Sequence, residues 1–456
     1  MSYEGGSVAD VVDRIFKAYD IRGKVCTELN ADIAYRVGRA FADWLPQTGV
    51  VAVGRDMRPD SKDLANAFIK GLREQGRDVL DIGQVTSDMI YFAVGNYNLA
   101  GGAVVTASHN PGEYNGIKLC REGAGGVGIE SGLGKIRDIT KAGRWESAKK
   151  EGTLEKKDIV KDWVRHVLAF VDVNKLKPLK VAVDAGNGMA GKIFPKLEPY
   201  VPFEVTEMYF ELDGTFPNHP ANPIEVDNLT DLIKVVKDKG LDAGVAFDGD
   251  GDRAFLVDEQ GNQVNGTVMT ALLADYFLTK NHKATILYNA ICGRIVPETI
   301  TKAGNKAIRT KVGHSYIKND IKTHGAIFAG EHSGHYYFKD NYGADSGMIA
   351  AVIGLAILSA SGKKLSEVVA PYRQAYVQIQ ETNFEVTDKD AILKKIAKAF
   401  PGSEQDTLDG LTVSFESSWF NVRPSNTEPL LRFNAEAKSK TGLDELVAKV
   451  TKLITG

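Results

Sequence analysis

Short apolar runs alternate with amphipathic stretches along the first three quarters of the chain. Residues 50–53 form one such run, and apolar residues at helical spacing follow over 61–75. A second apolar run at 78–82 completes a strand–helix–strand unit. Units of this kind place helices over the faces of a largely parallel sheet. The pattern therefore predicts the α/β class for this part of the chain.

The same pattern appears twice more. Strands are predicted at 180–184 and 242–247 with a helix over 228–239 between them, and again at 284–288 and 325–329. The predicted strand at 101–105 resembles the second strand of each of these pairs, at 242–247 and 325–329. All three strands are short, rich in glycine and alanine, and lead directly into a polar loop. We expect three similar mixed α/β domains, each offering one loop from an equivalent strand: 106–110, 248–253 and 331–335.

The last segment has a different periodicity. Residues 376–386 and 411–437 alternate like antiparallel strands, and helical spacing occurs near 389–399 and 443–454. This predicts a separate C-terminal α+β domain. Polar stretches and turn signals place the expected domain boundaries so that the four domains are 1–154, 155–257, 258–370 and 371–456.

Composition excludes several classes of protein. The 456 residues are 43% hydrophobic and 25% charged, with a formal net charge of -3, so nothing favours nucleic acid or an anionic membrane as a partner. Three widely spaced cysteines fit a reducing compartment, and residues 1–10 lack the apolar core of a signal peptide. The longest apolar run, 348–358, is too short to span a bilayer and predicts a buried helix. A cytoplasmic location is expected.

The loop at 106–111 is the first candidate for chemistry. Ser108 and His109 follow the buried strand at 101–105, and the carboxyl ends of such strands carry the ligand sites of open α/β sheets. A serine there can act as a nucleophile or carry a phosphoryl group. The alternative is a serine that caps a turn, which an isolated Ser-His pair favours. The assignment therefore depends on the other loops.

The strongest single motif is Asp248-Gly-Asp250-Gly-Asp252-Arg253. Three carboxylates at alternating positions form an oxygen-rich site that suits a hard cation such as Mg²⁺. A calcium loop of the EF-hand type competes, since Glu259 stands at its twelfth position, but Arg253 replaces the glycine required at the sixth. The following residues also alternate as in a hairpin. A plain acidic turn is the remaining alternative.

Two other loops carry polar groups suited to a sugar phosphate. Glu331, Ser333 and His335 supply an acid, a hydroxyl and an imidazole, which suit sugar hydroxyls, although zinc is a second possibility. The loop at 423–429 combines an arginine with hydroxyls and turn backbone, as a phosphate dianion requires, and a rigid hairpin turn is the alternative. Its candidate ligands are Arg423, Ser425, Asn426 and Thr427.

A glycine-rich stretch at 123–128 matches the dinucleotide-binding pattern G-x-G-x-x-G literally. No second buried strand follows it, because the chain turns polar through 141–157. Dinucleotide binding is therefore not expected there.

Six motifs in this order, spread over essentially the whole chain, resemble the α-D-phosphohexomutase superfamily. They are residues 19–23, the serine loop at 106–111, the metal loop at 248–253, residues 312–315, the sugar loop at 330–335 and the phosphate loop at 423–429. The resemblance implies three similar α/β domains and a smaller C-terminal domain around a central active-site cleft. Within the superfamily, Glu-x-Ser-Gly-His and Asn426 resemble the phosphomannomutase/phosphoglucomutase group. Phosphoglucosamine mutases, the alternative, usually carry glycine where Asn426 stands.

The resemblance also implies residue roles. Considered singly, Arg22, Lys118 and His314 would be surface or packing residues, but by resemblance they serve acid–base and electrostatic functions. Ser108 carries the phosphoryl group and His109 orients its loop. One Mg²⁺ per chain is bound by Ser108, Asp248, Asp250 and Asp252. Substrate is bound by Tyr19, Arg253, Glu331, Ser333, His335, Arg423, Ser425, Asn426 and Thr427.

The implied reaction interconverts hexose 1-phosphate and hexose 6-phosphate, with mannose or glucose or both as the sugar. A hexose bisphosphate is the expected intermediate or activator, and the chain is expected to be a monomer or a homodimer. One departure affects the sugar contacts: several superfamily members have a lysine where residues 288–292 have none. A phosphatase that uses water as acceptor, and a sugar-phosphate-binding protein without activity, are the rival hypotheses.

Overall fold

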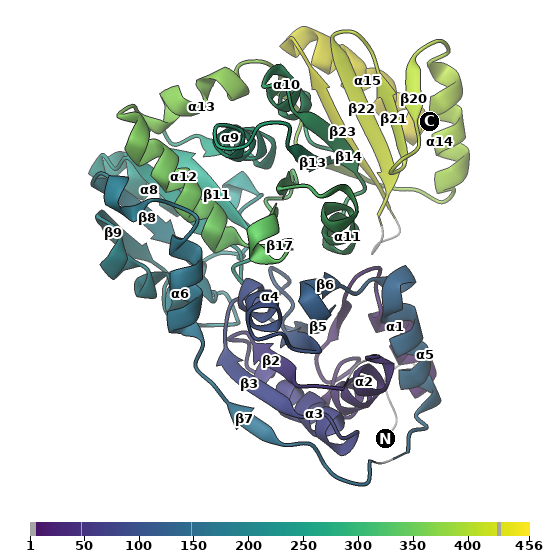
Figure 1. The fold of residues 1–456 in the computed structure, drawn as a ribbon. Helices are drawn as coiled ribbons and strands as arrows, with labels where there is room; N and C mark the ends of the chain where they lie inside the picture. Colours follow the sequence, from purple (N-terminus) through teal and green to yellow (C-terminus); the bar gives the residue numbers. More distant parts are fainter. Residues whose placement is uncertain (1–5, 47, 147, 426–429) are drawn as a thin grey trace.

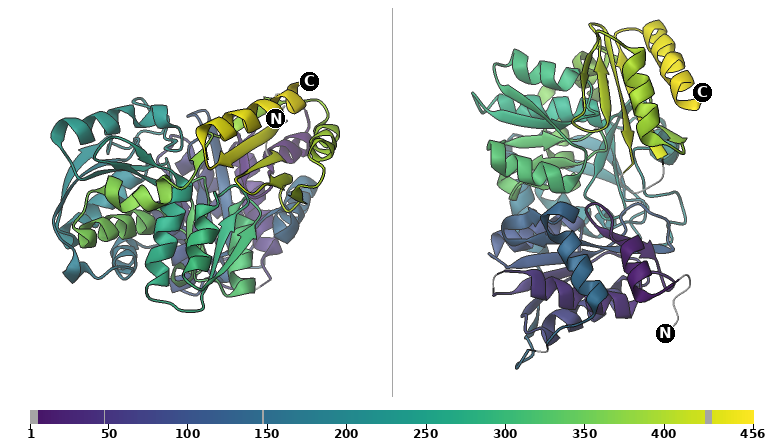
Figure 2. Two further views of the ribbon diagram at one scale, coloured as in Figure 1. Left: turned by 90° about the horizontal axis from the view of Figure 1, so that it is seen from above. Right: turned by 90° about the vertical axis from the view of Figure 1, so that its right-hand side faces the viewer.

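In the residues that it describes, a computed structural model shows four β-sheets, each with its own helices (Figure 1). The structure describes residues 6–46, 48–146, 148–425 and 430–456. Figure 1 places the N-terminal sheet at the bottom of the view, the second and third sheets above it and the C-terminal sheet at the upper right. The views in Figure 2 show the same four bodies from above and from the side.

The first sheet has the strand order β1-β5-β4-β2-β3-β7, with the two-residue strand β6 (Gly125–Gly126) pairing with β5. Strands β2, β3 and β4 are parallel, as the strand–helix–strand pattern predicts, and β5 returns antiparallel to β4. The other strands are β1 (Ile21–Lys24), β2 (Val51–Arg55), β3 (Val79–Gln84), β4 (Gly101–Val105), β5 (Tyr114–Arg121) and β7 (Leu154–Lys156). The helices are α1 (Val8–Ile15), α2 (Ala31–Trp44), α3 (Ser61–Glu74), α4 (Ser87–Asn96) and α5 (Gly134–Ala142).

The second sheet has the order β12-β11-β10-β8-β9, with β8, β9 and β10 parallel. Its strands are β8 (Leu179–Asp184), β9 (Phe203–Met208), β10 (Ala243–Phe247), β11 (Ala254–Asp258) and β12 (Gln263–Val264). Its helices are α6 (Val160–Leu168), α7 (Ala190–Ile193) and α8 (Thr230–Lys239).

The third sheet has the order β14-β13-β15-β16-β17. Its strands are β13 (Thr285–Asn289), β14 (Lys306–Thr310), β15 (Phe328–Gly330), β16 (Tyr336–Phe338) and β17 (Ala344–Asp345). Its helices are α9 (Gly266–Leu278), α10 (Ile295–Lys302), α11 (His314–His324), α12 (Gly347–Ser361) and α13 (Leu365–Arg373).

One feature is common to these three sheets. A short buried strand, β4, β10 or β15, is parallel to its inner neighbour and pairs antiparallel with the next strand of the chain, β5, β11 or β16. The three polar loops predicted from the sequence are the connections between these antiparallel partners. The expected repeat of three similar α/β domains is therefore confirmed.

The fourth sheet is antiparallel, with the order β18-β23-β22-β21-β20 and β19 also pairing with β23. It has its own core, which includes Ile396, Phe420 and Phe433. The predicted α+β class of this domain is confirmed. Its elements are β18 (Val377–Gln378), β19 (Thr382–Glu385), α14 (Lys389–Ala399), β20 (Glu404–Asp406), β21 (Leu411–Ser414), β22 (Ser418–Pro424), β23 (Leu430–Ala437) and α15 (Lys440–Thr455).

Two local details differ from the expected elements. The strand predicted at 325–329 begins only at Phe328, because α11 continues to His324 and Gly325 ends it in a left-handed conformation (φ +60°). Helix α13 continues through Pro371 and ends at Arg373, so the chain leaves it at Gln374.

The apolar run at 348–358 is a buried helix, as predicted. It forms α12, which packs against β11, α9 and α6 and is almost fully buried. Among the described helices, none is both long enough and apolar enough to cross a membrane singly. Only α12 and α13 together meet that criterion, and a 108° bend separates them.

Candidate active site

Ser108 and Asp248 lie 140 positions apart in the sequence and meet at the centre of the site. The Ser108 hydroxyl donates a hydrogen bond of 2.6 Å to Asp248 Oδ2. The Ser108 backbone is left-handed (φ +51°), and its N–H donates to Thr106 Oγ1 at 2.9 Å. A non-glycine residue adopts this conformation only where its surroundings impose it. The loop at the end of β4 is thus fixed with the serine hydroxyl directed at the acidic loop at the end of β10.

Arg58 fixes the backbone of the serine loop. It was not among the residues predicted for the site. Its guanidinium donates to the carbonyl oxygens of Ser108 (2.9 Å), Asn110 (2.6 Å), Pro111 (2.9 Å) and Tyr114 (2.8 Å). Buried carbonyl groups need such donors, and a planar arginine supplies several at once. The only signal in the sequence is its place just after the strand that ends at Arg55, so its role could not be predicted from the motif pattern.

The three aspartates of the acidic loop converge as predicted. Oxygen atoms of Asp248, Asp250 and Asp252 all lie within 4.8 Å of one another, and all three side chains are buried. Within the described part of the chain, Asp250 Oδ1 and Asp252 Oδ1 have no hydrogen-bond partner. Buried carboxylate oxygens without donors are costly unless a cation binds them. The donor set therefore fits a hard divalent cation.

Lys118 lies against the same cluster. Its ammonium is 2.7 Å from Asp250 Oδ2 and 2.5 Å from Asp252 Oδ2, and the side chain is 9% exposed. Burial opposes ionisation of these carboxyls, but the Lys118 ammonium outweighs it, so the pKa of Asp250 is lowered and that of Asp252 falls to about 2. The two carboxylates in turn raise the pKa of Lys118 despite its burial. Lys118 is consequently a protonated donor beside the serine loop.

His109 is held in the neutral form. Burial and the nearby Arg253 guanidinium lower its pKa well below the usual value. Its Nδ1 lies 2.5 Å from Arg253 Nη2, so it accepts a hydrogen bond, and it is 3.2 Å from the Ser108 hydroxyl. Arg253 also donates through Nε to Asp248 Oδ2 at 2.9 Å. His109 thereby links the serine loop to the acidic loop.

Arg22 and His314 are two further residues predicted for the site, from the first and the third domain. Arg22 donates to Asn110 Oδ1 at 2.6 Å and to Asp20 Oδ2 at 2.5 Å. The His314 ring contacts Tyr19 edge-on, with 5.1 Å between ring centres. Neither ring nitrogen of His314 has a hydrogen-bond partner in the residues described, and burial together with the Lys318 ammonium lowers its pKa to about 3. His314 is therefore a neutral imidazole with an open acceptor nitrogen.

The sugar loop reaches the acidic cluster through His335. Its Nε2 is 3.5 Å from Asp252 Oδ1, and its Nδ1 is 3.0 Å from the Ser333 hydroxyl. Glu331 is fully engaged within the third domain. Its carboxylate accepts hydrogen bonds from Tyr337 (2.6 Å), the Asn289 side chain (3.1 Å) and the backbone N–H of Gly313 (3.2 Å).

The phosphate loop is described only in part. Arg423 and Ser425 are buried, whereas the predicted ligands Asn426 and Thr427 lie outside the described residues. Arg423 Nη2 is 3.0 Å from the Glu381 carboxylate, a second residue that the sequence analysis did not single out. In the stretch 288–292, which was expected to lack the lysine of several superfamily members, Ile291 is buried against a small cavity lined also by His332, Trp419 and Asn434.

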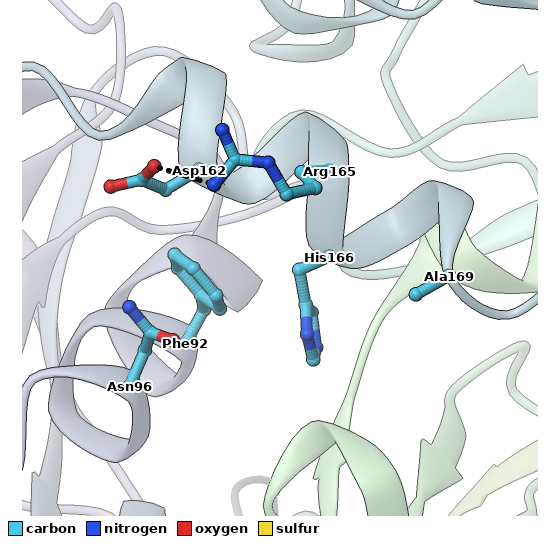
Figure 3. A pocket seen from close by; sticks show the side chains of 6 residues that line it. All are labelled: Phe92, Asn96, Asp162, Arg165, His166 and Ala169. Carbon is cyan, nitrogen blue, oxygen red and sulfur yellow. Dashed lines mark ion pairs between the residues drawn. The ribbon is translucent and has the colours of Figure 1, made fainter.

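A larger cavity lies elsewhere, between helices α4 and α6. It has a volume of about 330 Å³ and is lined by Phe92, Asn96, Asp162, Arg165, His166 and Ala169 (Figure 3). None of these was predicted to bind substrate. The candidate active site is thus defined by converging loops and not by this cavity.

Comparisons with known proteins cover almost the whole chain. Family profiles described as "Phosphoglucomutase/phosphomannomutase" match residues 13–146 (α/β/α domain I), 161–261 (domain II), 265–376 (domain III) and 381–453 (C-terminal domain). A "Phosphohexose mutases" protein of Xanthomonas campestris is 38% identical over 97% of this chain and 99% of its own length. A "Phosphomannomutase" of Salmonella montevideo is 38% identical over 95% of this chain and 97% of its own.

Solved structures of similar proteins have the same fold over almost the whole chain. A phosphoglucomutase/phosphomannomutase family protein of Burkholderia thailandensis is 32% identical, with a TM-score of 0.89 over 98% of this chain and 97% of its own. An Aspergillus fumigatus N-acetylphosphoglucosamine mutase, solved with GlcNAc-6P and magnesium, shares the fold at 14% identity, with a TM-score of 0.62 over 98% of both chains. The full-length matches, the four domain profiles and the converging loops together show that the chain belongs to the phosphoglucomutase/phosphomannomutase family.

Proposed function

We propose that the protein is a phosphohexomutase that interconverts hexose 1-phosphate and hexose 6-phosphate, with mannose or glucose as the sugar. The observation that carries the proposal is the hydroxyl of Ser108, held 2.6 Å from Asp248 in a buried carboxylate cluster with Lys118 beside it. A phosphoryl group on that oxygen would lie between a cation site and a protonated lysine. This is the charge neutralisation that phosphoryl transfer requires.

In the proposed reaction Ser108 carries the phosphoryl group in the active enzyme. The bond between phosphorus and the Ser108 oxygen breaks as a sugar hydroxyl forms a new bond to phosphorus; the sugar hydroxyl loses its proton to a base, and the Ser108 oxygen takes up a proton. The product is a bisphosphorylated sugar. It then turns round and its other phosphoryl group passes to the Ser108 oxygen, which gives up its proton, while the released sugar oxygen takes up a proton.

Asp248, Asp250 and Asp252 would hold Mg²⁺ together with an oxygen of the Ser108 phosphoryl group. When bound, the ion would neutralise the negative charge that develops on the phosphoryl oxygens. The two carboxylate oxygens without donors support this assignment. Magnesium was present in the structure of the fungal fold relative.

Proton movement falls to residues on either side of the serine loop. Lys118, kept protonated by Asp250 and Asp252, would donate to the oxygen that is released. His314 is neutral and has an open ring nitrogen, so it would assist proton transfer by accepting a hydrogen bond from the attacking hydroxyl. Arg22, anchored by Asp20, would stabilise charge on the phosphoryl group.

The remaining predicted residues would position the substrate. Ser333 and His335 would contact sugar hydroxyls, and Glu331, held by three donors, would fix the loop that presents them. Tyr19 and Arg253 would complete the sugar and phosphate contacts. Arg423, Ser425, Asn426 and Thr427 would hold the phosphate that does not react.

The assignment is tested by supplying mannose 1-phosphate, glucose 1-phosphate and glucosamine 1-phosphate with Mg²⁺ and a trace of hexose bisphosphate. We expect isomerisation of the mannose or glucose substrate, or both. Preference for glucosamine 1-phosphate would favour the phosphoglucosamine mutase alternative. Release of inorganic phosphate would indicate a phosphatase, and binding without turnover would indicate a non-catalytic binding protein.

A further inference from the structure

The connection between β9 and α8 extends from the second domain to the serine loop of the first. Within it, the 213–222 loop contacts Arg58, the residue that fixes the serine loop. The Phe216 ring centre lies 5.1 Å from Arg58 Cζ, with the guanidinium over the ring. A guanidinium in this position is attracted by the negative face of the ring. Gly214 also approaches closely, since a Cβ added to it would lie 2.5 Å from Arg58 Cα.

The tip of the Phe216 ring reaches the junction of the serine and acidic loops. A Cβ added to Gly249 of the acidic loop would lie 2.4 Å from the Ser108 carbonyl oxygen and 3.1 Å from Phe216 Cζ. Arg58 Nη2 donates to the same carbonyl oxygen at 2.9 Å. The ring, the guanidinium and the Ser108 backbone therefore lie together at the point where the two loops meet.

A tight turn imposes the position of the ring. The Phe216 backbone is left-handed (φ +54°), which a bulky residue adopts only where its surroundings determine it. The Asp213 side chain accepts hydrogen bonds from the backbone N–H (2.9 Å) and the hydroxyl (2.7 Å) of Thr215. The Asp213 carbonyl accepts one from the Phe216 N–H at 3.1 Å. Asp213 thus holds the turn that presents Phe216.

The 213–222 loop is anchored in the second domain at both of its ends. Near its start, the Asp213 N–H donates to the Asn187 carbonyl oxygen at 3.0 Å, and Asn218 Nδ2 donates to Asn187 Oδ1 at 2.8 Å. At its end, Asn222 Oδ1 accepts a hydrogen bond of 3.2 Å from Arg253 Nη1 of the acidic loop. The loop is therefore fixed to the same domain as the acidic loop.

Arg58 receives different contacts from the two domains. Its hydrogen bonds go to carbonyl groups of the first domain, and its Nε lies 3.3 Å from Asp56 Oδ2, also in the first domain. Its side chain is 1% exposed, and the Phe216 ring contacts it from the second domain. Through this contact, the position of the second domain can determine the position of the serine loop.

We propose that Phe216 is a positioning residue for phosphoryl transfer: it holds the Arg58 guanidinium against the carbonyl groups of the serine loop and so keeps the Ser108 oxygen aligned with the acidic loop. The proposal rests on the mutase function proposed above. Ser108 and the acidic loop belong to different domains, so their alignment depends on contacts between those domains. A displacement of a reacting group by about 1 Å can cost roughly 10²-fold in rate.

The test is Phe216→Leu, which keeps an apolar side chain but removes the ring. We expect kcat for glucose 1-phosphate with Mg²⁺ to fall roughly tenfold, whereas KM should change less than about twofold, because the residues proposed to bind substrate are unchanged. Hydrogen exchange of the backbone amides over 106–115, measured by mass spectrometry without substrate, should become roughly tenfold faster, since the serine loop would open more often.

A double-mutant cycle tests whether Phe216 acts through Arg58. Arg58→Gln removes the cation, so Phe216→Leu should lower kcat by less than about twofold further in that background. Asp213→Ala tests the same contact without a change in the protein interior, because it releases the partly exposed turn that presents Phe216. This variant should lower kcat and speed exchange over 106–115 in the same direction as Phe216→Leu.

Phe210→Leu is the matched control. Phe210 lies in the same connection, before the 213–222 loop, and packs against the apolar cluster that includes Ile193. The control removes an identical ring from the second domain while the contact between Phe216 and Arg58 stays in place. Its kcat, its KM and its exchange over 106–115 should equal those of the parent chain.

An unchanged kcat in Phe216→Leu would overturn the inference. An unchanged exchange rate over 106–115 would do the same, as would a loss of kcat in the Arg58→Gln background as large as in the parent. Exchange is measured without turnover, so it does not depend on the proposed reaction. If the parent isomerises no sugar phosphate but exchange rises in Phe216→Leu and not in Phe210→Leu, the proposed function fails while the support of the serine loop by Phe216 stands. If the parent isomerises and neither kcat nor exchange changes, the inference about Phe216 fails alone.

Discussion

The two ends of the proposed substrate site handle charge in different ways. Around Ser108, anionic and cationic groups from two domains are already paired, with Asp248 bonded to Arg253 and Asp250 and Asp252 bonded to Lys118. At the phosphate loop, Arg423 and Arg432 both contact the carboxylate of Glu381. The first arrangement suits a fixed centre where bonds break, and the second suits a surface that binds and releases an anion repeatedly.

The two ends also differ in how they are built. The serine and acidic loops meet through direct contacts between the first two domains, and Arg58 binds three carbonyl groups of the serine loop and that of Tyr114 at the start of β5. The phosphate loop belongs to a sheet with its own core. A domain with an independent core can move relative to its neighbours when the interface between them is small. In the proposed function, the chemistry takes place at the first end, and the second end binds the phosphate that does not react.

Ser108→Ala should have the largest effect. Removal of the hydroxyl eliminates the group that carries phosphoryl, so kcat should fall by about 10⁴-fold or more. Intact-mass measurement of the parent protein should show an added phosphate-sized increment that the variant lacks. Near-normal mutase turnover in Ser108→Ala would refute the assignment of chemistry to this end.

Loss of the cation should have the second-largest effect on turnover. Chelation, or Asp250→Asn, should reduce turnover by about 10²- to 10³-fold, because the charge on the phosphoryl group would no longer be neutralised. Mg²⁺ should restore the chelated parent, whereas Ca²⁺ should bind but support poor turnover, since its coordination is longer and looser. Equal rates with the two ions would contradict the proposed geometry.

Arg423→Ala should weaken the other end without affecting the chemistry. We expect KM to rise strongly and turnover to slow for both glucose and mannose substrates, a cost of about 2–4 kcal/mol in kcat/KM for a charge-assisted contact. The variant should still be phosphorylated on Ser108. A defect confined to one sugar, or unchanged kinetics, would show that this loop does not bind the shared phosphate.

The smallest effect concerns a pH-dependent contact behind the acidic loop. His219 Nε2 lies 3.0 Å from the carboxylate of Asp184, at the end of β8. Burial opposes protonation of His219, but the hydrogen bond to Asp184 and the charge of its carboxylate outweigh burial and raise the pKa of His219. A raised folded-state pKa stabilises the protein below pH 6.5, and this stability is lost as the pH rises through the folded pKa. The Tm difference between the parent and His219→Gln should be larger at pH 5.5 than at pH 8.5. A difference that grows with pH would contradict this sign.

Loops that carry a motif could be predicted from the sequence, whereas the residues that support them could not. The acidic loop has a distinctive spacing, and its three aspartates do converge. Arg58 and Glu381 have no motif. Their contacts depend on how the serine loop folds over the first sheet and on the register of β22 and β23, which are properties of tertiary structure. The repeat of three domains was predictable because each repeats one strand-and-loop pattern.

The central claim is that Ser108 passes its phosphoryl group to a sugar and not to water. The most direct measurement is a single turnover with the enzyme phosphorylated at Ser108 by an isotopically labelled phosphoryl group, mixed with unlabelled glucose 1-phosphate and Mg²⁺. We expect the label to appear first in a hexose bisphosphate and then in glucose 6-phosphate. Label released as inorganic phosphate, with no labelled sugar, would contradict it.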